Sequence, residues 1–594
     1  MLNKPFQSPS TASFFNNLTV SRLQGLLRRG ELGLVALAVM IGIAAGLLVS
    51  LVSFLSEALH YLVFGVEGTL SGSGITGPIV LAGPIIGGIA LGIIVFILSR
   101  TRKKPMVDPI EANALHGGRL SLTDSIIVCV QNIVSNGFGA SVGLEAGYTQ
   151  IASGFASKLG VKLKMRRGDL RLLVGCGASG AIAAAFDAPL TGAFYAVELI
   201  IGSYTVVTLA PVIVSALVAK IVTSQIGGHG LSIDIGAVGD ITPVDYLPAI
   251  MLGVLCAGVG IVLMQAVSFV EETARKSAVS QPIRPMIGGI VIGLLALVSP
   301  QILAGGHGAL HINLNSETTI YSLVLLFVLK SAASAVSIGS GFRGGLFFAS
   351  LFMGALLGKI FAFAAMLVPG LTLTPVIYAV VGMSAFAAAV IGGPLTMTFL
   401  ALELTGDFPI TALVLASVIT TSLVVRVFFG YSFATWRFHL RGETIRSAQD
   451  VGWIRDLTVA KMMRADVRTA KLSMGLEEFC KQFPLGSTQR VIMVNDDGRY
   501  AGIVLLAEIY ADPMDRNSEG RNLESYLHYT KDVLLPTMNV KQAAALFDAT
   551  QSEALAVMND RIQNRPIGLL TESHTLRRYS EELDLRRREA SGEF

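Results

Sequence analysis

Long stretches without a charged residue dominate the first 440 positions of this sequence. They are Leu32–Ser56, Gly68–Ser99, Ser125–Gly143, Ile200–Ala219, Leu247–Val270, Pro285–Ser316, Ile360–Leu402 and Phe408–Val425. A helix needs about 20 apolar residues to cross the hydrocarbon core of a bilayer, and most of these stretches reach that length. The pattern therefore predicts an α-helical polytopic membrane protein rather than a soluble globule.

Charge divides the chain sharply, because residues 1–440 carry 42 charged side chains and residues 441–594 carry 44. We expect a cytoplasmic N-terminal segment at 1–30, a membrane domain at 31–438, a linker at 439–458 and a soluble C-terminal part at 459–594. Three arginines precede the first apolar stretch, which favours a cytoplasmic N-terminus. The net charge of +4 is too small to indicate a nucleic-acid partner.

The membrane part contains an internal repeat at an offset of 205 residues. Gly177–Leu199 and Gly382–Leu404 align without a gap and share 11 of 23 residues, including Pro-Leu-Thr and the glutamates Glu198 and Glu403. We expect these glutamates to hydrogen-bond to backbone within the packed repeat. Many apolar segments are broken by glycine or proline, and duplicated halves with interrupted helices are typical of transporters. The alignment alone leaves open whether the two halves run parallel or inverted.

Two glycine-rich loops carry the candidate chemistry. Glu145 lies in the first loop, Ser141–Gly147, and the second is Gly339–Phe347; each precedes an expected helix. Helix N-termini present free N–H groups and the positive end of a dipole, so such loops bind anions. An ionised carboxylate can occupy an anion site and leave it when protonated, which would make Glu145 a protonatable gate. The alternative is a glutamate that caps its own helix or faces a vestibule.

Other polar residues of the membrane part have simpler interpretations. Asp108 and Glu111 lie in a proline-flanked loop that predicts a turn and a helix cap. Gly-Gly-His-Gly occurs twice without acidic or thiol partners nearby, so we expect flexible loops and no metal site. The apolar region offers no nucleophile and base at enzymatic spacing, and we do not expect an enzyme.

The loops, their order and the repeat together resemble the CLC family of chloride channels and proton-coupled chloride transporters. The family's gating loop is similar to Gly143–Gly147, its phenylalanine loop to Gly345–Ala349, and its serine loop to Pro105–Pro109. The resemblance implies a homodimer in which each subunit holds an inverted-repeat pore of broken, tilted helices. It implies Glu145 as the gating glutamate and the following anion-binding positions: Met106, Val107, Gly143, Leu144, Ala146, Leu346 and Phe347, with Phe433 or Tyr431 as the pore aromatic.

Two departures from the family pattern bear on function. Met106 stands where the family's anion-coordinating serine would be, as it does in the fluoride-exporting branch. The internal proton-transfer glutamate of exchangers would follow Glu198, but Leu199 is there. We expect selective chloride transport across the inner (plasma) membrane, with proton-coupled exchange favoured slightly. An uncoupled chloride channel and a transporter of fluoride or another anion are the alternatives.

The C-terminal part holds two similar units, at about 459–513 and 526–580, in which apolar strands are punctuated by turn residues. They resemble a cytoplasmic pair of α+β CBS domains, followed by a charged, solvated helix. CBS pairs often bind adenine nucleotides, and Thr571 and Glu508 stand at positions that would contact one. A purely structural pair is favoured over a nucleotide sensor, and no other cofactor is expected. A CBS-regulated cation transporter is a further alternative, but the membrane part has few acidic residues to hold a cation.

Overall fold

The computed structural model describes residues 31–66, 70–102, 106–227, 241–316, 318–367, 369, 373–440, 457–511, 522–560 and 563–591. The chain forms two compact units, Met1–Asp450 and Val451–Phe594, each described here by itself. Their boundary falls within the expected linker, which lies mostly outside the described residues. The expected N-terminal segment 1–30 also lies outside them.

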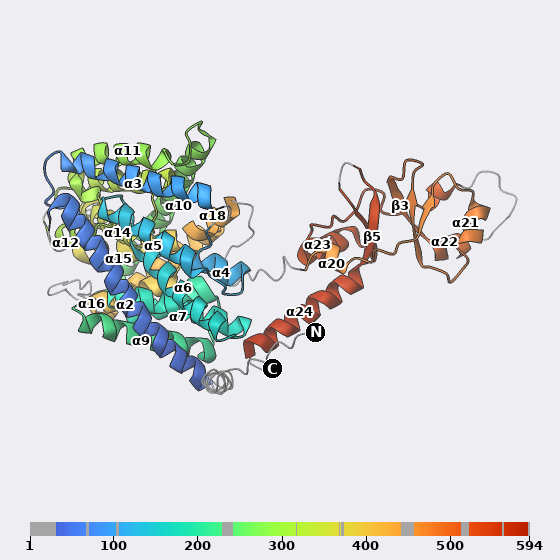
Figure 1. Cartoon of the computed structure of the whole chain (residues 1–594), viewed down its shortest axis with the longest axis horizontal. Coiled ribbons are helices and arrows are strands. Elements are labelled where there is room, and N and C mark those ends of the chain that lie inside the picture. The colour runs from blue at the N-terminus through green and yellow to red at the C-terminus, as the bar shows by residue number, and fades with distance from the viewer. Residues whose placement is uncertain are drawn as a thin grey trace, which may run out of the picture. The chain divides into compact units, whose positions relative to one another are not determined.

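The first unit, here called the membrane unit, is helical throughout its described part (Figure 1). Its N-terminal half comprises α2 (Glu31–Phe64), α3 (Ile79–Thr101), α4 (Pro109–Leu115), α5 (Leu122–Gly137), α6 (Glu145–Lys162), α7 (Arg167–Phe186), α8 (Pro189–Tyr195), the π-helix η1 (Ala196–Ile201) and α9 (Val206–Gln225). Its C-terminal half comprises η2 (Pro243–Asp245), α10 (Tyr246–Lys276), α11 (Arg284–Val298), η3 (Pro300–Ile302), α12 (His307–Asn315), α13 (Ile320–Ser340), α14 (Phe347–Ala365), α15 (Pro375–Ile391), α16 (Pro394–Thr405), α17 (Phe408–Phe428) and α18 (Phe433–Leu440).

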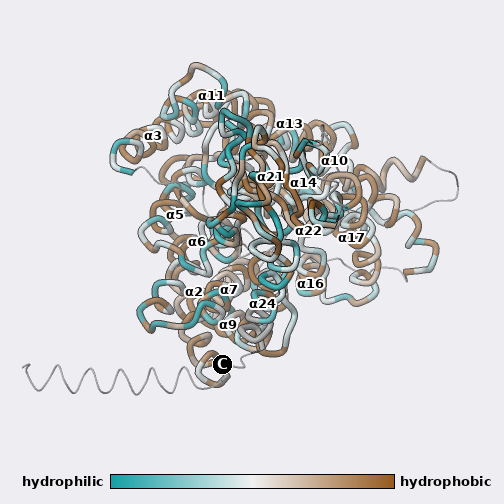
Figure 2. The backbone as a smooth tube through the Cα atoms, turned by 90° about the vertical axis from the view of Figure 1, so that its right-hand side faces the viewer, coloured by the Kyte–Doolittle hydropathy of each residue, from teal (hydrophilic) through white to brown (hydrophobic). Residues whose placement is uncertain are grey.

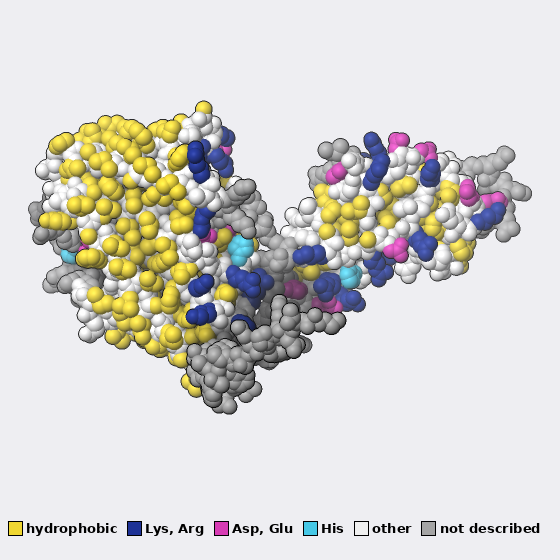
Figure 3. Space-filling model, viewed as in Figure 1, with side chains coloured by type: hydrophobic (Ala, Val, Ile, Leu, Met, Phe, Trp, Pro, Cys, Tyr) yellow, Lys and Arg dark blue, Asp and Glu magenta, His cyan; other side chains and the backbone are white. Residues whose placement is uncertain are grey.

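Within the described ranges, eight helical spans are long and apolar enough to cross a bilayer. Hydrophobic residues run along these helices, and apolar side chains cover much of the face shown in Figure 3 (Figures 2 and 3). The helices differ in burial, because α7 and α14 are mostly buried inside the unit whereas α9 and α17 expose apolar side chains. Helices such as α4, α8 and α16 are too short to span a bilayer. The interrupted helices expected from the glycine and proline content are therefore present.

The two halves repeat the same packing. Helix α2 packs on α9 as α10 packs on α17, and α6 packs on α7 as α14 packs on α15. Two helix pairs join the halves, α3 with α11 and α8 with α16. In the first pair, Gly88 approaches the backbone of Pro285 while Gly293 approaches that of Leu81, so the helices run antiparallel. The repeat is thus inverted, which the alignment alone could not decide.

The repeated glutamates lock α8 to α16. Glu198 accepts hydrogen bonds from the N–H groups of Leu395 (3.0 Å) and Thr396 (2.8 Å) at the start of α16. In the same way, Glu403 accepts from the N–H groups of Leu190 (2.7 Å) and Thr191 (2.8 Å) at the start of α8. Each carboxylate caps the helix of the opposite half, where the free N–H groups and the dipole favour a negative charge. The expectation that these glutamates bond to backbone is confirmed.

The second unit, here called the C-terminal unit, contains a three-stranded and a two-stranded sheet within its described residues. Its elements are α20 (Val459–Met462), β1 (Thr469–Lys471), α21 (Leu476–Gln482), β2 (Arg490–Val494), β3 (Tyr500–Leu505), α22 (Leu506–Ala511), η4 (Leu523–Tyr526), α23 (Val540–Thr550), β4 (Ala554–Met558), β5 (Pro566–Thr571) and α24 (Glu572–Ser591). The three-stranded sheet has the order β1-β2-β3, with β1 and β2 parallel, and the two-stranded sheet consists of β4 and β5. The pairs β2–β3 and β4–β5 are antiparallel, and each has a register shift at its second-to-last position. This correspondence shows that the unit is itself a tandem of two similar parts.

The two parts of the C-terminal unit exchange their leading segments. Arg464, ahead of the first part, pairs with Leu569 on β5 of the second. His528, ahead of the second part, pairs with Ile503 on β3 of the first. Each part thus completes the sheet of the other. The charged helix expected from Leu576 to Glu589 lies inside α24.

Candidate functional site

The two glycine-rich loops meet through their backbones. The Gly143 N–H donates to the carbonyl oxygen of Gly345 (2.9 Å), and the Gly345 N–H donates to that of Gly143 (3.2 Å). Helix α6 begins two residues after Gly143, and α14 begins two residues after Gly345. Neither N-cap residue, Leu144 or Leu346, can cap its helix with a side chain. Two helix starts whose N–H groups are left for another acceptor therefore lie side by side.

Polar side chains of α5 hold this loop pair in place. The Asn132 amide donates to the carbonyl oxygens of Gly143 (3.1 Å) and Arg343 (3.0 Å), which belong to different loops. Asn136, one turn along α5, donates to the carbonyl oxygen of Val142. Neither Asn132 nor Asn136 was predicted from the sequence as a functional residue. A signal for them exists, since Asn132 and Asn136 are uncharged polar residues four positions apart in an apolar stretch.

Glu145 occupies the space between the two helix starts. Its side chain is only 4% exposed, and its carboxylate faces the N–H groups of Glu145 itself and of Phe348. The atom Oε2 is buried and has no hydrogen-bond partner within the described structure. The same oxygen lies where a Cβ on Gly143 would be, so Gly143 leaves the room that the carboxylate fills. The carboxylate is thus placed where a small anion would meet both helix dipoles.

Other positions expected from the family resemblance surround this carboxylate. Leu144 and Leu346 immediately precede α6 and α14, and both are buried. Ala146, in the first turn of α6, approaches Gly345 across the loop pair. Phe347 is buried, and its ring centroid lies 6.0 Å from that of Tyr195 on α8. The structure therefore brings the two loops together as expected, and it adds Tyr195.

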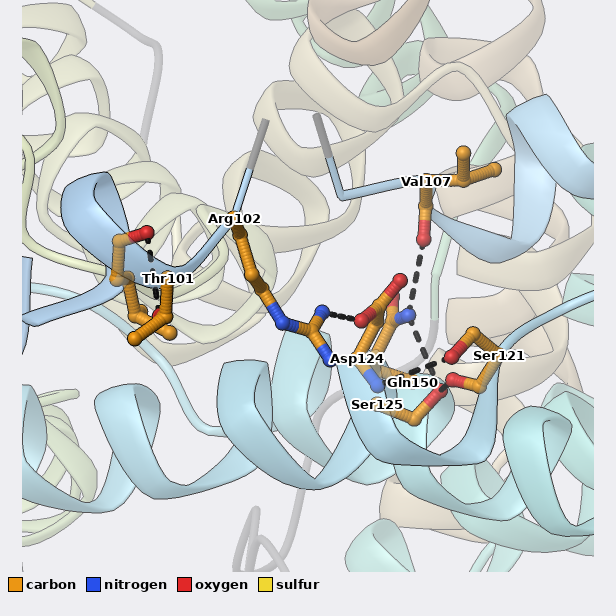
Figure 4. Close-up of polar contacts among 8 residues, drawn as sticks. Thr101, Arg102, Val107, Ser121, Asp124, Ser125 and Gln150 are labelled. Atoms are coloured by element: carbon orange, nitrogen blue, oxygen red, sulfur yellow. Dashed lines mark hydrogen bonds and ion pairs between the residues drawn. The ribbon is translucent and has the colours of Figure 1, made fainter. Parts of the chain in front are cut away.

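Met106 and Val107 lie just before α4 and are tied to α6. The Gln150 amide on α6 donates to the Val107 carbonyl oxygen (3.0 Å) and to the Ser125 hydroxyl (Figure 4). Asp108 accepts a hydrogen bond from the Glu111 N–H (2.8 Å) and so caps α4, as expected. The α4 start therefore differs from those of α6 and α14, because a carboxylate of its own loop already occupies it.

The two candidates for the pore aromatic lie in different surroundings. Phe433, at the start of α18, is buried and belongs to the same hydrophobic cluster as Phe347. Tyr431 lies in an aromatic group with Trp436 and His439, and its hydroxyl is 3.2 Å from the Nδ1 atom of His439. Burial thus favours Phe433.

A second candidate site is a cavity of about 780 Å³ in the C-terminal unit. Its lining includes Arg464, Thr488, Arg490, Thr571, Ser573 and His574. Burial lowers the pKa of His574 from its ordinary value, and the positive charges of Arg577, Arg464 and Arg578 lower it further. The lining also includes Glu572 and Glu553, and Glu553 pairs with Arg490, so the hydroxyl groups and Arg464 are the groups that suit an anionic ligand.

Glu508 does not line this cavity, although Thr571 does. The Glu508 carboxylate instead pairs with the Nε2 atom of His528 (2.6 Å). His528 leads the second part of the unit as Arg464 leads the first. The two nucleotide positions expected from the sequence therefore lie in different places, and at Glu508 a hydrogen bond with His528 engages the carboxylate.

Comparison with known proteins identifies the family. Residues 87–426 match the family model described as voltage gated chloride channel, and this span is more than half of the chain. The chain belongs to the voltage-gated chloride channel family. Members of this family are transporters or channels, not enzymes. Within the described residues, no group of three or more His, Cys, Asp or Glu side chains could hold a metal ion.

Several curated family members resemble the membrane unit. A ClcB-like protein of Ralstonia nicotianae is 31% identical over 343 residues, which are 57% of this chain and 80% of that protein. The voltage-gated ClC-type chloride channel ClcB of an Escherichia coli strain is 26% identical over 349 residues, which are 57% of this chain and 83% of that protein.

Solved structures of the same family share the fold. A slow cyanobacterial Cl⁻/H⁺ antiporter matches with a TM-score of 0.60 and 21% identity, over 69% of this chain and 97% of its own. A CLC-type fluoride/proton antiporter matches with a TM-score of 0.56 and 18% identity, over 66% and 95%. A eukaryotic CLC transporter matches with a TM-score of 0.59 and 18% identity, over 93% and 98%. The last match is longer than the membrane unit, so it extends into the C-terminal unit.

Proposed function

We propose that this protein transports chloride across the membrane and that Glu145 is its protonatable gate. The observation that carries the proposal is the buried Glu145 carboxylate between the starts of α6 and α14. An ionised carboxylate there excludes a second anion by repulsion and by occupying the N–H groups. When protonated, the carboxyl group no longer repels an anion and binds the N–H groups less strongly, so an anion can take its place.

We favour proton-coupled exchange over an uncoupled channel. Each time Glu145 leaves the site protonated and returns ionised, one proton can move relative to the anion. The absence of an acid at Leu199 is the argument for the channel alternative. The CBS-regulated cation transporter is disfavoured because the loop pair presents N–H donors, whereas a hard cation requires oxygen ligands.

The choice of anion rests on Met106. A thioether offers no hydrogen bond to an anion where the family's serine would offer one. Fluoride is therefore the second candidate substrate, and the fold is shared by a fluoride/proton antiporter as well as by a chloride/proton antiporter. Competition between the two halides for transport decides between them.

Flux from proteoliposomes tests the proposal. Purified protein is reconstituted with a chloride gradient, and chloride efflux and external pH are recorded together. We expect protons to be driven uphill by the chloride gradient, and this coupling to be lost in Glu145→Ala. Glu272→Gln, at an exposed glutamate of α10, is the matched control and retains both fluxes. Chloride flux without proton movement in the unmodified protein supports the channel alternative. Fluoride flux without chloride flux would identify fluoride as the substrate.

We further propose that the C-terminal unit is a cytoplasmic CBS pair and that the protein is a homodimer in the plasma membrane. The exchanged leading segments and matching strand pairs support a tandem pair. Binding of an adenine nucleotide is assigned to the cavity around Thr571 and Arg464 rather than to Glu508. Isothermal titration of the full-length protein with ATP, and cross-linking in membranes, test these assignments.

A further inference from the structure

One buried side chain of α5 contacts both glycine-rich loops and the first turn of α6. The Asn132 amide nitrogen donates to the carbonyl oxygen of Gly143 in the first loop (3.1 Å) and to that of Arg343 in the second (3.0 Å). The Asn132 amide oxygen accepts from the N–H of Gly147 in α6 (2.9 Å). The side chain is fully buried, and its oxygen and nitrogen both have partners. A buried polar group that is satisfied in this way holds its neighbours in one arrangement.

The surroundings of Asn132 leave its amide one position and one orientation. A Cβ on Gly147 would lie 2.4 Å from the Asn132 Oδ1 atom, so the glycine lets the amide oxygen approach α6 closely. A reversed amide would direct its oxygen at two carbonyl oxygens and its nitrogen at an N–H group, which rules that orientation out. The amide therefore fixes the distances between the first loop, the second loop and the start of α6.

The other polar side chains of α5 at this place contact one loop each. Asn136 donates to a carbonyl oxygen of the first loop (2.6 Å), and the Ser135 hydroxyl accepts from an N–H group of the second (3.0 Å). Of these three side chains, only Asn132 contacts both loops. It also binds the Gly143 carbonyl oxygen, which takes part in the backbone pair with Gly345. Asn132 thus reinforces the connection that sets how far apart α6 and α14 begin.

We propose that Asn132 is a positioning residue that sets the spacing of the two helix starts and thereby the size of anion that the site prefers. The inference rests on the proposed anion transport and deepens it by naming a determinant of selectivity. Asn132 acts through the loops, because its amide hydrogens point at the two carbonyl oxygens. Chloride and bromide carry the same charge and differ in size, so the spacing of the donors distinguishes them. A restrained spacing favours one size, whereas a loosened spacing adapts to both.

Two substitutions loosen this connection in different ways. Asn132→Leu keeps a side chain of similar shape and removes all three hydrogen bonds. Gly147→Ala keeps the asparagine and places a Cβ against its Oδ1 atom. In each variant we expect the KM for bromide, relative to the KM for chloride, to fall about 10-fold, the lower end of what residues that support the ligands of a metal site contribute. Glu145 is retained, so chloride flux should still rise as pH falls.

Asn113 on α4 provides a matched control. It is also a buried asparagine, and its amide nitrogen donates to the carbonyl oxygens of Arg171 on α7 and Ile200 on η1, each at 3.1 Å. None of these three residues belongs to either glycine-rich loop. Asn113→Leu should therefore lower the stability to a similar extent and retain the bromide-to-chloride ratio of KM values.

The measurement is the initial rate of transport into proteoliposomes over a series of chloride or bromide concentrations, with the full-length protein or a variant. A lowered ratio of KM values in Asn132→Leu or Gly147→Ala, with the ratio unchanged in Asn113→Leu, supports the inference. An unchanged ratio in both loop variants overturns it and leaves anion transport standing. The same change in Asn113→Leu also overturns it, since lost stability would then be the cause. No transport of either halide by the unmodified protein overturns the proposed function, and the role of Asn132 with it.

Discussion

Gly143 determines where the Glu145 carboxylate can rest. A Cβ at this position would overlap Oε2 of Glu145. A Cβ at Gly345, in the other loop, would lie 3.6 Å from the same oxygen, which is an ordinary contact distance. The glycine therefore acts by leaving space rather than by supplying a group. Its backbone N–H and carbonyl are both used in the pairing with Gly345, and a substitution would leave those bonds available.

We predict that Gly143→Ala displaces the Glu145 carboxylate and weakens the pH dependence of chloride flux. Overpacking a buried site costs about 1–3 kcal/mol, so a moderate loss of stability is expected as well. Stopped-flow chloride efflux at pH 5 to 8 measures the effect. Gly258→Ala is the matched control, because no atom lies within 4 Å of the Cβ it would gain on α10. A Gly143→Ala protein with unchanged pH dependence would contradict this role of the carboxylate position.

His574 gives the C-terminal cavity its own pH dependence. Burial and the positive charges of the surrounding arginines lower its pKa, so its imidazole is less than half charged at a pH where a free histidine is half-charged. A bound anion offsets the positive charges and raises that pKa again, and binding therefore takes up a proton. We predict that the affinity for ATP rises as pH falls through the ordinary histidine range, and that His574→Gln removes this rise. Titration calorimetry of the full-length protein at several pH values measures it; equal slopes in both proteins would contradict the prediction.

At the scale of elements, the α8–α16 pair joins the two halves of the membrane unit. Helix α8 is capped by Glu403 of α16, and α16 is capped by Glu198 of η1, which directly follows α8; Phe194 and Phe399 stack between α8 and α16 with centroids 4.3 Å apart. These phenylalanines occupy equivalent positions of the repeat, as do the two glutamates. The pair is therefore symmetric in its chemistry as well as in its packing.

We predict that Glu403→Gln lowers the melting temperature of the detergent-solubilised protein. The amide replaces one acceptor oxygen with a donor that faces the N–H groups of α8, a loss of about 1–3 kcal/mol. Because the repeat is symmetric, Glu198→Gln should have a similar effect. The control is Glu272→Gln on the exposed face of α10. An unchanged melting temperature for both buried variants would show that the caps do not stabilise the interface.

The sequence was sufficient for the elements whose signals are local. The apolar stretches, the Pro-Leu-Thr repeat and the Asp108 cap all follow from residues close together in the chain. The inversion of the repeat does not, because it depends on the relative direction in which α3 and α11 pack. The packing of the Tyr195 ring against Phe347 was also missed, since it joins segments far apart in sequence and neither alternation nor spacing marks it. The spacing of Asn132 and Asn136 on α5 could be seen in the sequence. Their role in holding the two loops could not, because it depends on which loop carbonyl oxygens they bind.

At the scale of the whole molecule, the two units have separate cores. The hydrophobic clusters of the membrane unit contain no residue of the C-terminal unit, and the reverse also holds among the described residues. We predict that a chain ending at Leu440 still folds in the membrane and transports chloride. Efflux from proteoliposomes holding this shortened protein measures it. A shortened protein that is inactive though folded would make the C-terminal unit part of the transport cycle.

The central claim is that protonation of Glu145 opens the anion pathway. Chloride flux from proteoliposomes over a range of pH, in the unmodified protein and in Glu145→Gln, tests it most directly. Glutamine resembles the protonated glutamate in shape and charge, so the variant should be fast at every pH, whereas flux through the unmodified protein should rise as pH falls. A Glu145→Gln protein whose flux still rises with acidity would place the gate at another residue.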